Sequence, residues 1–319
     1  MRDIVGQKRI VQKTGTSTLI VSLPRTWTER TGVKKGSELF ALEQPDGSMV
    51  LSTRPDEEKR ESFDLSLDDV PSKDELSRKF YSAYIAGFDS IRVHSSSRIT
   101  PELRKTVLQE TKRLIGLEIV DETPNVIVVK DFFSREGLSV EKTLKRMHLI
   151  TCSLFEDLLE GKELDAVVER DDEVDRLRFL LLRQLNLALK NPQVLRGLNL
   201  TANRCIDYAT ATLYIERIAD HVTAMAKILS REKTDVFKPF RQPFEKVYSL
   251  YKDSVKAFLE KDFALSMKTI KSKPSLHSEM GELNKRLWQK GMGYSPLVEH
   301  SNSILDGSEG IAEQAINQS

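Results

Sequence analysis

The amino-acid sequence predicts a multi-domain chain with three parts: a small β-rich unit, a small α/β module and an all-helical region. Two observations predict this division. Short β-rich runs separated by turn residues fill the chain up to position 53, whereas nothing after Val140 has the alternation of a strand. A charged stretch at 54–61, Arg-Pro-Asp-Glu-Glu-Lys-Arg-Glu, separates the first part from the second. A length of 319 residues suits two or three domains.

The composition is that of an ordinary globular protein. Lys and Arg number 49 and Asp and Glu 48, so the net charge of +1 excludes a chain that is basic throughout, although it permits a local basic patch. No apolar run approaches the ~18 residues of a membrane span, and the first residues lack the apolar segment of a signal peptide. Cys152 and Cys205 have neither disulfide-scaffold nor zinc-finger spacing. These features predict a cytoplasmic protein without membrane insertion.

Residues 1–54 form the first predicted domain. The expected elements are strands at 9–12 and 18–23, a helix at 25–31, and a hairpin of 39–43 and 49–51 with its turn at 45–47. Pro24 suits the entry to the helix and Gly32 its C-terminal end. The domain has few large apolar residues, which is too little for an independent core, so we expect it to dimerise.

Residues 62–135 form the second predicted domain, a small α/β module with the element order βαβαββ. The expected strands lie at 62–67, 90–94, 117–120 and 125–130, and the expected helices at 73–87 and 101–115. Thr100 followed by Pro101 is typical of the start of a helix, because the hydroxyl can cap a free N–H and proline tolerates the first turn.

Residues 140–319 form the third predicted domain, an all-α pair of three-helix bundles at about 140–230 and 241–319. The expected helices lie at 140–160, 162–190, 193–230, 241–260, 262–291 and 294–316. The run Leu-Glu-Gly-Lys-Glu-Leu at 159–164 is echoed by Leu-Glu-Lys-Asp-Phe-Ala at 259–264, which indicates an internal duplication at an offset of 100 residues.

Two acidic pairs in the first bundle are candidate metal ligands. Asp171 and Asp175 are four apart on one predicted helix, and Glu216 and Asp220 are four apart on the next. Like charges at this spacing cost about 0.2–0.5 kcal/mol on a helix, and more when desolvated, so a bound cation would relieve them. Carboxylate oxygens suit hard cations. The spacing alone leaves open the alternative that both pairs lie on solvated faces.

The second bundle lacks this pattern. At the 100-residue offset, Asp171 and Asp175 correspond to Lys271 and Ser275, and the last helix offers only Asp306 beside Asn302 at comparable positions. No histidine has glutamate three residues before it, which argues against a di-iron carboxylate bundle. We therefore expect a metal site in the first bundle alone.

The helical region resembles the PhoU family over about 140–319. The resemblance is carried by Asp-x-x-x-Asp at 171–175, by Glu-Arg-Ile-Ala-Asp-His at 216–221, and by Ile-Ala-Glu at 311–313. It implies negative control of phosphate uptake and phosphate signalling, with a phosphate transporter or signalling proteins as partners. It also implies a multinuclear divalent or trivalent metal cluster (Fe, Zn, Mg or Mn) on the carboxylates.

The first domain resembles the AbrB/SpoVT swapped-hairpin family. The matching residues are Val-Ser-Leu-Pro at 21–24, Trp27, and Gly-Val-Lys-Lys-Gly-Ser at 32–37. The resemblance implies an intertwined dimer, and many such domains bind DNA. Residues 1–36 hold eight Lys and Arg against two acidic residues, an excess that suits phosphate contacts. The candidate DNA-binding residues are Lys8, Arg9, Lys13 and Arg25.

One departure from the AbrB pattern leaves a second hypothesis open. Thr28 and Glu29 stand where DNA-binding members often carry an arginine pair, so the domain could serve dimerisation alone. The combined resemblance is to archaeal phosphate-uptake regulators, and we expect a homodimeric or larger DNA-binding regulator. The alternative is a regulator that docks on a transporter ATPase or a sensor kinase without touching DNA. No nucleophile–base set is visible, which argues against an enzyme.

Overall fold

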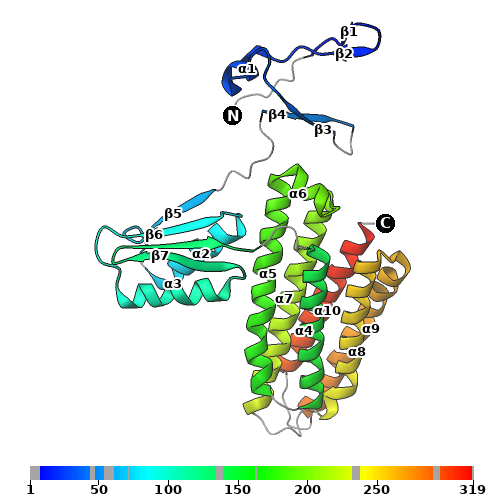
Figure 1. Ribbon diagram of the computed structural model, residues 1–319. Coiled ribbons are helices and arrows are strands. Elements are labelled where there is room, and N and C mark those ends of the chain that lie inside the picture. Colours follow the sequence, from blue (N-terminus) through cyan, green and yellow to red (C-terminus); the bar gives the residue numbers. More distant parts are fainter. Residues whose placement is uncertain are drawn as a thin grey trace. The chain divides into compact units, whose positions relative to one another are not determined.

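The computed structural model describes residues 8–43, 47–53, 61–70, 72–133, 139–161, 164–231, 238–289 and 295–317. The chain divides into two compact units, residues 1–60 and 61–319 (Figure 1). The predicted fold class is confirmed: small antiparallel strand pairs come first, then a small sheet module, then a helical region. Three predicted segments lie mostly outside the described residues. They are the turn at 45–47, the linker at 54–61 and the boundary at 135–140.

The first unit contains two hairpins and one short helix. Its elements are β1 (Gln12–Thr14), β2 (Thr18–Ile20), α1 (Arg25–Thr31), β3 (Phe40–Glu43) and β4 (Met49–Ser52). Strand β1 pairs with β2 and β3 with β4, both antiparallel. The helix has the predicted bounds: Pro24 precedes it, and Gly32 ends it at φ 71°, where its N–H donates to the Thr28 carbonyl. The left-handed conformation is why glycine stands there.

No described residue of this unit is buried within the single chain. Large apolar side chains are strongly exposed, among them Ile10 at 78%, Leu19 at 68% and Met49 at 64%. β-rich segments with so much exposed apolar surface are unstable alone in water. The unit therefore lacks the apolar burial that a stable monomer requires.

The second unit begins with a four-stranded sheet. Its elements are β5 (Ser62–Ser66), α2 (Lys73–Ile85), β6 (Ser90–His94), α3 (Pro101–Arg113), β7 (Leu117–Thr123) and β8 (Val126–Asp131). The order in the sheet is β5-β6-β8-β7; β5 and β6 are parallel and the other pairs antiparallel. The predicted βαβαββ order is confirmed, and the Thr100 hydroxyl caps α3 by accepting from the Leu103 N–H.

The helical region follows. Its helices are α4 (Val140–Glu160), α5 (Leu164–Lys190), α6 (Pro192–Gly197), α7 (Ala202–Arg231), α8 (Lys238–Glu260), α9 (Phe263–Gln289) and α10 (Ser295–Ile316). One hydrophobic cluster runs through both predicted bundles, and it includes the unpaired cysteines Cys152 and Cys205. Helices α7 and α10 approach closely at Gly310. A Cβ at this position would lie 2.4 Å from the ring of Tyr214, so only glycine permits the approach.

Two helix predictions were wrong in detail. The single helix expected at 193–230 is broken into α6 and α7, because Asn199 adopts φ 54° and ends the first, while the Thr201 hydroxyl accepts from the Arg204 N–H and starts the second. Asparagine tolerates the left-handed conformation and threonine is a good N-cap, so local chemistry was available to predict the break. The break expected to extend to Pro243 is shorter, since α8 starts at Lys238 and contains this proline.

Candidate metal site and nucleic-acid interface

The four candidate carboxylates lie on the neighbouring helices α5 and α7. Asp171, Asp175 and Glu216 are partly buried, and Asp220 is exposed. The i,i+4 spacing places each pair on one side of its helix. The two pairs face each other closely enough that the charge of Asp220 raises the pKa values of Asp171, Asp175 and Glu216. The structure therefore brings all four side chains into one electrostatic cluster, which we call the carboxylate site.

Burial and mutual repulsion make this site costly to ionise. Desolvation, followed by the charges of Asp220 and Asp175, raises the pKa of Asp171 to about 6. Desolvation also raises the pKa of Glu216 to about 7, against the opposing effect of Arg178. The pKa values of Asp175 and Asp220 are raised in the same direction, again mainly by desolvation. A positive charge placed here would be stabilised by every member of the site.

Arg178 supplies part of that positive charge. Its Nε lies 3.2 Å from Glu216 Oε1 and 3.9 Å from Asp175 Oδ1, so one guanidinium bridges α5 and α7. The guanidinium also lies over the ring of Phe179, 4.6 Å from its centroid. Arg178 is three residues after Asp175, and this spacing was the signal that could have identified it from the sequence.

A second arginine comes from the α/β module. Arg113, at the end of α3, places Nη2 3.5 Å from Asp172 Oδ1 and 3.8 Å from Asp175 Oδ2. Its Nη1 donates to the hydroxyl of Tyr81 at 3.3 Å. No local pattern in the sequence points to Arg113, because its acidic partners lie on α5, outside its own module.

The four carboxylates suit a hard cation, although in this structure two of them pair with Arg178. Among the residues that the structure describes, no three His, Cys, Asp or Glu side chains converge as a metal site requires. Four carboxylates with raised pKa values are nevertheless the ligand chemistry of Mg²⁺, Mn²⁺ and related ions. A cation held by Asp171, Asp175, Glu216 and Asp220 would take over the charge that Arg178 now balances.

In the corresponding part of the second bundle, a lysine side chain balances the carboxylates. Lys273 on α9 places Nζ 2.6 Å from both Asp306 Oδ1 and Glu309 Oε2 on α10. An ammonium with two carboxylate partners leaves little reason for a metal ion there.

His221, next to Asp220 in sequence, has its Nδ1 3.1 Å from Nδ1 of His300 on α10.

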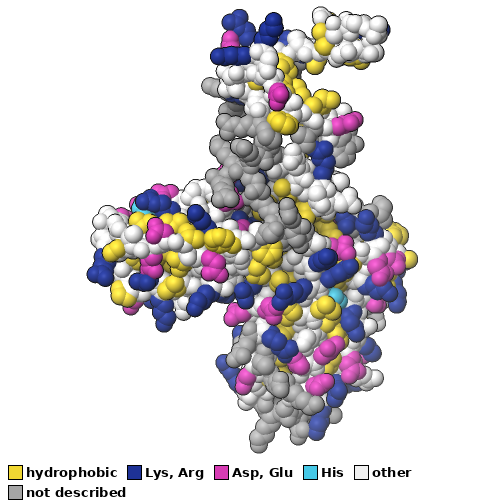
Figure 2. Space-filling model, viewed as in Figure 1, with side chains coloured by type: hydrophobic (Ala, Val, Ile, Leu, Met, Phe, Trp, Pro, Cys, Tyr) yellow, Lys and Arg dark blue, Asp and Glu magenta, His cyan; other side chains and the backbone are white. Residues whose placement is uncertain are grey.

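The candidate DNA-binding residues are all exposed on the first unit. Lys8 and Arg9 precede β1, and Lys13 lies within it. Arg25 opens α1, around which Lys and Arg side chains gather in Figure 2. Its Nε lies 2.8 Å from Glu29 Oε1, so this residue is partly neutralised within the chain.

Comparisons with known proteins agree with this division. Residues 141–229, from α4 to α7, match the model of the PhoU domain. This part of the chain is similar to a PhoU domain. Residues 12–60 match the model described as antidote-toxin recognition MazE, bacterial antitoxin. A search of curated proteins and a search of solved structures each returned no match.

These matches confirm both suspected resemblances, the PhoU resemblance over residues 141–229 and not over the second predicted bundle. The PhoU domain indicates regulation of phosphate homeostasis, and the MazE/AbrB-like domain indicates DNA binding. Both are regulatory rather than catalytic families. Among the described residues, none of the helices combines the length and apolar character that a bilayer span requires.

The raised pKa values predict a pH-dependent effect of Glu216→Gln in the PhoU domain. Desolvation raises the pKa of Glu216 from 4.5 to about 7 in the folded state, so the folded state binds more protons than the unfolded state between these pH values. The charging of Glu216 therefore destabilises the folded protein as the pH rises through this range. In EDTA, the variant should gain thermal stability relative to the wild type between pH 5 and pH 8. A difference in melting temperature that stays constant across this range would contradict the raised pKa.

Proposed function

We propose that this protein is a cytoplasmic, phosphate-responsive regulator of phosphate uptake that binds DNA through its first unit. The observation that carries the proposal is the joining of a basic MazE/AbrB-like unit to a PhoU domain with a clustered carboxylate site. The PhoU domain would sense metal or phosphate status, or a transporter or signalling partner, and shift the DNA affinity of the first unit through linkage. We propose that the protein is a regulator and not an enzyme.

The carboxylate site is proposed to hold a divalent or trivalent cation. Alanine at Asp171, Asp175, Glu216 and Asp220 together should abolish bound metal in elemental analysis of protein equilibrated with Mn²⁺. Alanine at Asp306 should leave the metal content unchanged, because Lys273 already balances that carboxylate. The bundle should stay folded, because the change removes mutually repelling charges and leaves Arg178 over the ring of Phe179 with 23% of its side chain exposed to water. Metal that persists in the quadruple variant would show that the site lies elsewhere.

The first unit is proposed to form a homodimer. Its apolar side chains are exposed in one chain, and a second copy with the same surface is the occupant that the family resemblance implies. Residues 1–54 should sediment as a dimer, and their unfolding temperature should rise with protein concentration. A fragment that is folded and monomeric would contradict this assignment.

One observation favours a rival function. The ion pair between Arg25 and Glu29 withdraws one of the four candidate cations from DNA. A regulator that docks on a transporter ATPase or a sensor kinase would need a dimeric first unit but no phosphate contacts. Salt-dependent binding to promoter DNA separates the two functions, because only the first predicts it.

A further inference from the structure

One side of helix α5 lies against the α/β module along much of its length. The rings of Phe179 and Tyr81 stack with centroids 4.8 Å apart. Further along, Asn186 Nδ2 donates to the Ile85 carbonyl at 3.1 Å, and Lys190 Nζ donates to the Ala86 carbonyl at 2.7 Å. These donors satisfy carbonyls at the C-terminal end of α2, which is where positive charge and hydrogen-bond donors stabilise a helix.

Arg183 is the strongest of these contacts. Its side chain is 3% exposed and donates to the Tyr84 carbonyl at 2.5 Å and to the Phe88 carbonyl at 2.9 Å. Its Nη2 also lies 2.7 Å from Asp131 Oδ2 at the end of β8. A buried guanidinium with this many partners fixes α2, β8 and α5 relative to one another.

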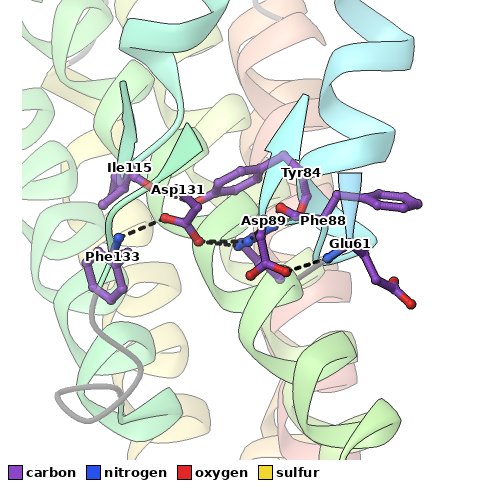
Figure 3. A network of polar contacts seen from close by, with 8 residues as sticks. Glu61, Tyr84, Phe88, Asp89, Ile115, Asp131 and Phe133 are labelled. Atoms are coloured by element: carbon purple, nitrogen blue, oxygen red, sulfur yellow. Dashed lines mark hydrogen bonds and ion pairs between the residues drawn. The ribbon is translucent and has the colours of Figure 1, made fainter. Parts of the chain in front are cut away.

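The same junction holds the start of the second unit. The N–H of Glu61, the last residue of the charged linker, donates to Asp89 Oδ2 at 2.9 Å, and the Asp89 N–H donates to the Glu61 carbonyl at 2.8 Å (Figure 3). Lys190 Nζ lies 3.7 Å from Glu61 Oε2. The chain thus leaves the linker at the point where α5 meets the module.

The other part of α5 carries the carboxylate site. Asp171 and Asp175 belong to this helix, and Arg113 of the module contacts Asp175 directly. We propose that α5 and the α/β module form one coupling element, in which Arg113 reads the charge of the carboxylate site and the Arg183 junction carries the response to Glu61 and the linker. This inference rests on the proposed function and assigns the α/β module its role.

The proposed coupling requires two arrangements of ion pairs, of which the structure shows the first. With the carboxylates charged and without a cation, Asp175 attracts both Arg113 and Arg178. When the charge of Asp175 is neutralised, Arg113 loses this partner and keeps Asp172 and Tyr81. Coupling between distant sites requires such an element, whose equilibrium both sites can bias.

Hydrogen exchange in the full-length protein tests the inference without metal or DNA. In EDTA, Asp175→Asn and Arg113→Ala should each accelerate amide exchange at 61–66 by about threefold or more, and the double variant should exchange no faster than either single variant. Arg104→Ala is the matched control, because Arg104 is also on α3 but pairs with Glu122 of its own module at 2.8 Å. Unchanged exchange in both single variants, or additive effects in the double variant, would overturn the inference.

A second arm separates this inference from the proposed function. Adding Mn²⁺ should change the affinity of the wild type and of Arg104→Ala for promoter DNA, whereas Arg113→Ala should bind DNA equally with and without Mn²⁺. Mn²⁺ binding without any change in the DNA affinity of the wild type would overturn the inference and leave the cation site standing. Absence of Mn²⁺ or DNA binding would count against the proposed function, and hydrogen exchange would then decide the inference.

Discussion

Replacing Arg183 with methionine will destabilise the folded protein by about 3–5 kcal/mol, because it leaves the Asp131 carboxylate buried without its cation. The side chain of Asp131 is only 11% exposed, so water cannot replace the lost partner well. The Tyr84 and Phe88 carbonyls lose donors in the same change. Urea unfolding followed by circular dichroism measures the loss.

Two further variants identify the cause. Arg183→Met with Asp131→Asn should recover a large part of the stability, since asparagine removes the unpaired charge and can still accept from the Phe133 N–H. Arg104→Met removes an ion pair whose side chains are 54% and 28% exposed, and should cost less than about 1 kcal/mol. A loss below about 1 kcal/mol for Arg183→Met itself would contradict the account of the junction.

Replacing Arg9 and Lys13 with alanine will weaken DNA binding and reduce its salt dependence. Lys8, Arg9, Lys13 and Arg25 from two chains would give a slope of log K against log salt of roughly −7 at about −0.9 per phosphate. We expect about −4 to −6, because Arg25 also pairs with Glu29. The double variant removes two cations per chain and should flatten the slope by about 3 to 4 in the dimer.

A matched pair of charges outside the first unit is the control. Lys105 on α3 and Lys256 on α8 are exposed, and their replacement by alanine removes the same charge. This variant should leave the slope unchanged, while deletion of residues 1–54 should abolish binding. Equal flattening by both double variants would show that the contacts to DNA are not confined to the first unit.

Elements whose ends are fixed by local chemistry could be predicted from the sequence. The bounds of α1 follow from Pro24 and Gly32, and the βαβαββ order follows from caps and turn residues that act within a few positions. The break between α6 and α7 was missed because the apolar pattern continues across it, although Asn199 supplied the signal.

The candidate site could be predicted only as far as its helices. Spacing placed Asp171 and Asp175 on one helix and Glu216 and Asp220 on the next, and the structure groups all four. Residue spacing could not identify Arg113 as a member of the site. Its position beside α5 depends on contacts between segments that are distant in the sequence. Whether the site holds a metal, and whether the four basic residues contact DNA, stay predictions.

The most direct test of the central claim is fluorescence anisotropy with a promoter fragment from the protein's own operon. The full-length protein is titrated across a salt series, with and without Mn²⁺ and phosphate. The account predicts binding near 50 mM salt, a slope of about −4 to −6, and an affinity that changes when Mn²⁺ or phosphate is added. No binding near 50 mM salt by the folded protein under any of these conditions would contradict it and favour docking on a transporter ATPase or a sensor kinase.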